Sequence, residues 1–177
     1  MEKTYALPED LFRHFSKEEL IRLLMEDGKL WVACDGLWFQ GAERASGMKE
    51  AMRQDLAMWE VFTRLEAARI KAFLHLPDHP GLAGLAAALP LRINNRSNAV
   101  TIRLEENRLL YRVETCRVQA AREKKGLPYH PCRAVGLVEY GDFARAVDDR
   151  IAMRCLSCWP EVSDTSCACA WEFFIDQ

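Results

Sequence analysis

Cysteine is the residue type in this sequence with the richest chemistry. The chain contains seven cysteines, and six of them fall between Cys116 and Cys169. Thiolates are strong nucleophiles and soft metal ligands. Because seven is an odd number, the cysteines cannot all pair with one another. The sequence therefore indicates a cysteine-centred site rather than a disulfide framework.

The spacing of the C-terminal cysteines predicts a metal site. Cys155 and Cys158 form a CxxC motif, which lets two thiolates reach one ion from a single tight turn. Cys167 and Cys169 are two residues apart, so both side chains would share one face of a regular strand. These four residues make up a local four-ligand set on two arms of a hairpin.

A non-local ligand set is the alternative, and it combines Cys116 and Cys132 with members of the C-terminal group. A site made only of sulfur suits zinc or, alternatively, an iron–sulfur cluster. Separate reduced thiols in the core, or redox or catalytic cysteines, are further alternatives. We expect the metal ligands to come from Cys116, Cys132, Cys155, Cys158 and Cys169.

Cys116, Cys34 and His130 each have an interpretation of their own. Cys116 precedes a short predicted helix, whose N-terminus favours the thiolate, so it is the candidate nucleophile. Cys34 falls on the apolar face of a predicted helix and is expected to pack in the core. His130 lies two residues before Cys132 and is expected at the surface, with a role as a substitute ligand as the alternative.

The longest predicted helix, about residues 48–74, carries two carboxylates on an apolar stripe. Asp55 and Glu66 fall among its tryptophan, phenylalanine and isoleucine positions, so burial should leave each paired, raised in pKa or bound to a cation. They are about 16 Å apart along a helix and cannot form one carboxylate pair. Glu66 is the candidate general base, and a salt bridge to Arg64 or Arg69 is the alternative.

The periodicity of the chain predicts the elements that must position these groups. Apolar residues at helical spacing predict N-terminal helices, and alternating residues predict a hairpin and two further strands. This order predicts one α+β domain over residues 1–177, with a helical half at about 10–90 and a sheet and cysteine-rich half at about 99–177. The sheet should have four mostly antiparallel strands. The expected helices are 16–28, 29–45, 48–74, 82–89, 118–125 and 135–147, and the expected strands are 100–104, 109–113, 150–156 and 167–175.

The charge balance and the chain ends restrict the function further. The 24 Lys and Arg residues nearly cancel the 26 Asp and Glu residues, which argues against nucleic-acid binding. No secretory signal or membrane span is visible in the sequence, so we expect a cytoplasmic protein that makes no membrane contact. Its expected partner is a small-molecule ligand, and a homodimer is left open.

The pattern from Cys116 onward resembles two known groups of bacterial and archaeal domains. These are the family named for L-2-amino-thiazoline-4-carboxylic acid hydrolase and the vinyl-4-reductase ligand-binding domains. An uncharacterised bacterial family resembles the chain more closely, because it shares the stretch from Cys34 to Phe39. The other residues that carry the resemblance are Thr115-Cys116-Arg117, Gly126-Leu127-Pro128, Cys132, Phe143-Ala144, Asp148-Asp149-Arg150-Ile151 and Cys169-Ala170-Trp171-Glu172-Phe173.

This resemblance implies a sheet domain of the NO-signalling and trafficking ligand-binding type, with Cys116, Cys132 and Cys169 near a small-molecule cavity. We expect the helices and sheet to bound that cavity, lined by Trp38, Trp59, Glu66 and Arg69. The resulting hypothesis is a metal-binding protein with a small-molecule cavity. The alternatives are a hydrolase of a small cyclic amidine or thiazoline-type substrate that uses Glu66 and Cys116, and a metal-stapled interaction domain without catalysis. Similarity of pattern does not establish an enzyme.

Overall fold

The two halves of the chain form two different layers of an α+β fold, as predicted. In the computed structural model, which describes residues 8–176, a four-stranded antiparallel sheet is packed against helices. The N-terminal half contributes α1 (Pro8–Phe12), α2 (Lys17–Phe73), α3 (Gly81–Ala88) and the 3-10 turns η1 (Leu89–Leu91) and η2 (Ile93–Arg96). The C-terminal half contributes β1 (Ala99–Leu104), β2 (Arg108–Thr115), α4 (Arg117–Lys124), α5 (Arg133–Val147), β3 (Ile151–Cys158) and β4 (Cys169–Ile175).

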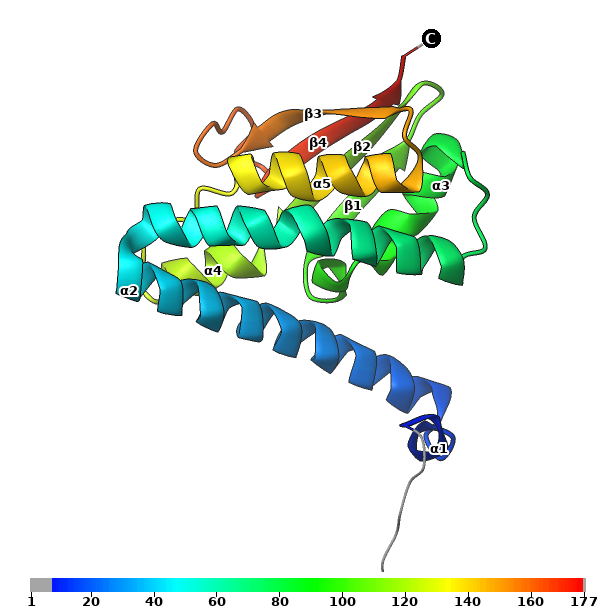
Figure 1. The fold of residues 1–177 in the computed structure, drawn as a ribbon, viewed down its shortest axis with the longest axis horizontal. Coiled ribbons are helices and arrows are strands. Elements are labelled where there is room, and N and C mark those ends of the chain that lie inside the picture. The colour runs from blue at the N-terminus through cyan, green and yellow to red at the C-terminus, as the bar shows by residue number, and fades with distance from the viewer. Residues whose placement is uncertain (1–7, 177) are drawn as a thin grey trace, which may run out of the picture.

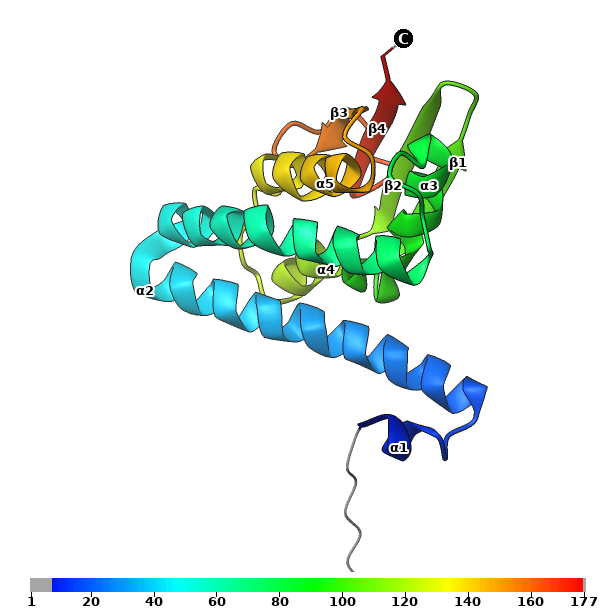
Figure 2. The same ribbon diagram turned by 45° about the vertical axis from the view of Figure 1, so that its right-hand side comes forward.

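The helix α2 differs from the prediction in its first half, where one continuous helix replaces the two expected at 16–28 and 29–45, whereas the break expected between residues 45 and 48 is present at Gly47. It begins at a capping box, in which Ser16 Oγ accepts from Glu19 N and the Glu19 carboxylate accepts from Ser16 N. Gly28 does not end the helix. A side chain there would collide with Arg96 of η2, so the glycine serves close packing instead. Gly47 is the true break, at φ 80° and ψ 165°, and the two halves fold back on each other there (Figures 1 and 2).

The sheet has the strand order β1-β2-β4-β3, and every neighbouring pair is antiparallel. Alternation along the strands places one apolar face against α5, which lies between the sheet and the second half of α2 (Figure 1). Tyr111 and Trp171 face each other in this layer and are fully buried. The helices lie on one side of the sheet in both ribbon views (Figures 1 and 2).

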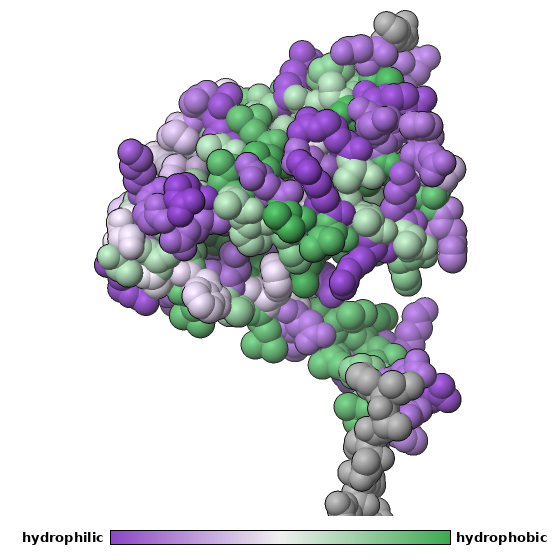
Figure 3. All heavy atoms as spheres, in the orientation of Figure 1, coloured by the Kyte–Doolittle hydropathy of each residue, from purple (hydrophilic) through white to green (hydrophobic). Residues whose placement is uncertain are grey.

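The first half of α2 is exposed, in contrast with the second half. Apolar side chains gather over α1 and the beginning of α2 (Figure 3), and they include Phe12, Phe15, Ile21 and Leu24. Among residues 8–176, no helix combines the length and the apolar character that crossing a membrane requires.

Candidate ligand cavity and its thiol, imidazole and carboxylate groups

A partly open cavity of about 420 Å³ lies between the two halves of α2, the helices α4 and α5, and one end of the sheet. Its walls are mostly apolar and include the aromatic side chains of Trp59, Tyr140 and Trp171. The break at Gly47 creates this space, because it brings residues 29–40 of α2 over the same end of α5 that residues 55–59 contact. The cavity is therefore a product of the chain reversal within α2.

Four of the five predicted metal ligands line this cavity. Each of them stands at the end of an element: Cys116 caps α4, Cys132 caps α5, Cys158 ends β3 and Cys169 begins β4. Cys158 and Cys169 are directly opposite each other in the strand register. All four are free thiols. Among the described residues, however, no three thiol sulfurs lie within 4.8 Å of one another.

The remaining cysteines lie elsewhere. Cys155 borders a second, shallower pocket with Arg133 and Glu161, so the structure separates it from the other four predicted ligands. Cys167 precedes β4 instead of belonging to it, and its Sγ lies 3.8 Å from Asp164 Oδ2. Cys34 is exposed, which corrects the expectation of core packing: the face of α2 that carries it meets no other layer.

A chain of three polar side chains forms one end of the cavity. His130 Nδ1 lies 3.2 Å from Cys132 Sγ, and His130 Nε2 lies 3.1 Å from Asp55 Oδ2. With the ring proton on Nε2 donated to Asp55, Nδ1 is free to accept the thiol proton. Asp55 is thus paired, as its place on the apolar stripe predicted, and His130 is buried, which corrects the expectation of a surface histidine.

Two neighbours hold this histidine in place. The Gln119 side chain donates to His130 O at 2.7 Å and to Cys132 Sγ at 3.1 Å, and it accepts from His130 N at 3.0 Å. Phe39 packs on the ring, with 4.5 Å between the ring centroids. The orientation of the imidazole is therefore fixed from α4 and from the first half of α2.

The cavity raises the pKa of the acids that face it. Burial raises the pKa of Cys132 well above its usual value, and the nearby Cys116 and Cys169 thiols add to the shift. Burial likewise raises the pKa of Cys116. For Asp35, burial and repulsion by Asp55 raise the pKa to about 6. These thiols are accordingly neutral at rest, and negative charge is costly in the cavity.

Glu66, the predicted general base, lies outside the cavity lining. Its Oε2 accepts from Arg92 Nε at 2.8 Å and its Oε1 accepts from Ile93 N at 2.6 Å. Arg92 is 1% exposed, and its Nη2 also lies 2.9 Å from Glu139 Oε1. The predicted alternative, a buried pair with an arginine, is thus what the structure shows, although Arg92 is the partner instead of Arg64 or Arg69.

Of the other residues predicted to line the cavity, one does so and two do not. Trp59 lines the cavity. Trp38 is 79% exposed and Arg69 is also exposed, and neither belongs to the lining. Both predictions relied on helical spacing, which gives a residue's face but not the layer that covers it.

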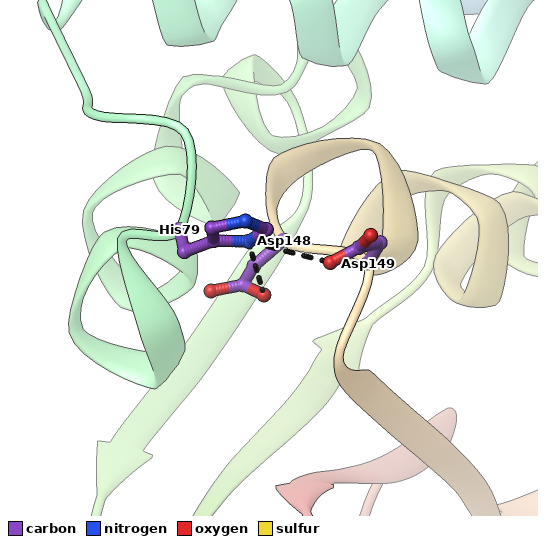
Figure 4. Close-up of side chains that lie close together, drawn as sticks. All are labelled: His79, Asp148 and Asp149. Atoms are coloured by element: carbon purple, nitrogen blue, oxygen red, sulfur yellow. Dashed lines mark ion pairs between the residues drawn. The ribbon is translucent and has the colours of Figure 1, made fainter.

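A second cluster of a histidine and aspartates lies on the far side of the fold (Figure 4). His79 Nδ1 is 3.6 Å from Asp148 Oδ1 and 3.3 Å from Asp149 Oδ1. Asp148 already accepts from Arg150 Nε at 2.9 Å and Nη2 at 2.7 Å, and from Gly81 N at 2.8 Å. Because its charge and lone pairs are used in this way, the cluster ties the turn before α3 to the start of β3.

Sequence reasoning missed the link between Asp55 and His130, which are 75 positions apart. Two signals in the sequence pointed towards this link. Asp55 lies on an apolar stripe and therefore needs a partner, and His130 lies in the same loop as Cys132. The pairing itself depends on the reversal at Gly47.

The fold and the site together define an α+β protein with a thiol-lined internal cavity. A family of unknown function, DUF6125, matches residues 13–175, and the chain belongs to this family. No curated protein sequence and no solved structure matches the chain. The resemblance to hydrolase-named and vinyl-4-reductase domains stays a prediction.

Proposed function

We propose that this protein binds a small, mostly apolar molecule in the cavity between α2, α4, α5 and the sheet. The observation that carries the proposal is the partly open cavity of about 420 Å³ with largely apolar walls. Ligand sites typically combine such walls with a few polar groups that fix orientation. Here Asp35, Asp55 and His130 supply those groups at one end.

The aromatic walls favour a flat ligand. Trp59, Tyr140 and Trp171 approach the space from α2, α5 and β4, and the Tyr140 and Trp171 rings lie 5.0 Å apart at a tilt. Such surfaces stack well against ring systems. A compact ring compound with one hydrogen-bonding group therefore suits the cavity better than an extended chain.

A zinc ion remains a proposed cofactor, with an iron–sulfur cluster as the alternative. The soft sulfur donors of Cys116, Cys158 and Cys169 suit zinc, and a bound cation would stabilise their thiolates. The spacing of these sulfurs does not match a zinc site, because no three thiol sulfurs among the described residues lie within 4.8 Å of one another. Cys132 is set apart, because His130 and Gln119 already engage its sulfur.

Two substitutions on α4 test the binding proposal. Val118 lines the cavity, whereas Ala120 on the same helix is exposed and outside the lining. We expect 2-naphthol to bind the wild type saturably in calorimetric titration, Val118→Trp to weaken this binding at least about tenfold, and Ala120→Trp to leave it unchanged. Absence of saturable binding, or equal binding by Val118→Trp, would contradict the proposal.

Metal analysis tests the cofactor separately. Protein purified without oxygen and without chelators should carry close to one equivalent of zinc or the iron of one cluster. Less than about one tenth of an equivalent of either would end the metal proposal and leave the cavity proposal intact.

A further inference from the structure

We propose that Cys132 is a nucleophile, activated by His130 and oriented through Asp55, that accepts the acyl group of a small ester or thioester bound in the cavity. The inference rests on the proposed ligand cavity and adds an activity to it. The carrying observation is the unbroken chain from Cys132 Sγ through His130 to Asp55, with steps of 3.2 Å and 3.1 Å.

The geometry meets the requirements of nucleophilic catalysis one by one. The nucleophile lies within hydrogen-bond reach of a base, and a third group orients that base from its other nitrogen. All three residues line the same cavity, so a bound molecule can reach the sulfur. Residues far apart in the sequence supply these parts, as a tertiary site requires.

The other cavity thiols lack such an arrangement. Cys169 Sγ accepts from Trp171 Nε1 at 3.2 Å and interacts with the Cys158 thiol, neither of which is a base. In the part of the chain that the structure describes, no histidine nitrogen is within hydrogen-bond distance of Cys116, Cys158 or Cys169. Cys132 is therefore distinguished by its neighbours, since burial is common to all four.

The electrostatic environment indicates how the thiol reacts. The thiolate is the attacking form of a cysteine, and His130 Nδ1, 3.2 Å from Sγ, is placed to remove the thiol proton. The imidazolium that forms is surrounded by carboxylates, because Asp55 contacts the ring while Asp35 and Glu43 lie close enough to interact with it. The charge of Glu43 is balanced by Arg122, which donates to both of its carboxylate oxygens.

The reaction balances with water as the only co-reactant. The thiol proton of Cys132 moves to His130 Nδ1 while Sγ bonds to the acyl carbon. The bond from that carbon to the alcohol or thiol leaving group breaks, and the leaving group takes the proton from His130. Water then attacks the thioester, His130 takes the water's proton, the carbon–sulfur bond breaks, and the proton returns to the sulfur.

Hydrogen-bond donors are available for the oxygen that becomes negative during attack. α5 begins one residue after Cys132, and in its first turn Arg133 N already donates to Trp159 O, whereas the N–H groups of Ala134 and Val135 have no partner among the described residues. The Gln119 amide donates to Sγ itself at 3.1 Å. The apolar walls suit a short aliphatic or aromatic acyl group, since charged acyl groups would be poorly solvated there.

Incubation with 4-nitrophenyl butyrate tests the proposal on the intact protein. We expect a burst of 4-nitrophenolate followed by turnover, and after a brief reaction quenched with acid, a butyryl group on the peptide that contains Cys132. Cys132→Ser should lose the burst and lower the rate at least about a hundredfold. The matched control Cys34→Ser should retain the rate within about threefold, because this exposed thiol lies outside the cavity lining.

Three results would overturn the inference: acylation spread evenly over the cysteines, a Cys132→Ser variant as active as wild type, or stoichiometric zinc that protects Cys132 from acylation. Binding of 2-naphthol separates this failure from failure of the cavity proposal. If wild type is not acylated but Cys132→Ser still binds 2-naphthol, the proposed activity is wrong and the proposed ligand cavity stands.

Asp55 is a positioning residue in this scheme, so its test needs a readout beyond loss of rate. Asp55→Asn should lower kcat for 4-nitrophenyl butyrate at least about tenfold and leave KM within about threefold. A rise in KM with an unchanged kcat would assign Asp55 to binding and remove it from the activation of Cys132.

Discussion

His130 and His79 both lie beside aspartates, yet their surroundings are opposite. The His130 side chain is 9% exposed and contacts a thiol, whereas the His79 side chain is 55% exposed and lies beside two carboxylates. Asp148 forms a salt bridge with Arg150, whereas among the described residues the structure gives Asp55 no arginine partner. Both clusters therefore have short distances from imidazole to carboxylate, and these distances alone do not distinguish the roles of the clusters.

The two clusters differ in the positive charge that balances each aspartate and in whether a ligand can reach it. The hydrogen bonds from Arg150 hold the pKa of Asp148 well below its usual value, so this carboxylate stabilises the fold and is unavailable to a ligand. The Asp55 carboxylate faces a cavity, and among residues 8–176 its side-chain partner is His130. One cluster fastens two segments together, and the other leaves a base next to a nucleophile.

The largest expected effect comes from exchanging the two histidines for alanine one at a time. His130→Ala should lower the rate of 4-nitrophenyl butyrate cleavage by about 10² to 10⁴, since a general base contributes that much. His79→Ala should leave the rate within about twofold. Stopped-flow detection of 4-nitrophenolate measures both.

Added imidazole is the control for misfolding in this pair. It should restore part of the lost rate to His130→Ala and do nothing for His79→Ala. Equal rates in the two variants would erase the functional distinction between the clusters.

A large stability effect is expected at the other cluster. Asp148→Asn should lower the free energy of unfolding at pH 7 by about 2–3 kcal/mol, because it weakens charge-assisted hydrogen bonds from Arg150 and Gly81. Since the folded pKa of Asp148 is depressed, this contribution is full above about pH 4, the unfolded value, and is lost as pH falls through the lower folded pKa. Urea unfolding at several pH values measures it, and a gap that widens below pH 4 would contradict the assignment.

A stabilising substitution is expected at the cavity cluster. The pKa of Asp35 is about 6 in the folded protein against its usual value of 3.8, so stability falls as pH rises from about 4 to 6 and stays reduced above that. Asp35→Asn should raise the free energy of unfolding by about 1–3 kcal/mol at pH 7 and have almost no effect near pH 4. Denaturant titration at both pH values checks this, and a destabilised variant at pH 7 would show that a partner satisfies the charge.

The smallest effect compares two adjacent residues on α2. Phe39 packs on the His130 ring, whereas Trp38 points to solvent. Phe39→Ala should cost about 1–2 kcal/mol of stability, and Trp38→Ala should stay within about 0.5 kcal/mol of wild type. Thermal unfolding distinguishes them, and equal losses would mean that Trp38 is covered in solution.

The sequence determined the types and order of most elements. Alternation predicted the hairpin and the last two strands, and the Ser16–Glu19 capping box marked the start of α2. It also placed cysteines at element ends, four of which meet in the cavity. These features depend on residues a few positions apart, so a linear pattern records them.

Only the tertiary structure decided which of these groups meet. The positive φ at Gly47 folds α2 back, and this brings Asp55 to His130 and leaves Trp38 outside. Arg92, which lies outside every helix and strand expected from the sequence, donates to Glu66 and holds it outside the cavity lining. Pairings between distant residues depend on how layers pack and on which charges find a buried partner, and the local spacing of residues does not encode those outcomes.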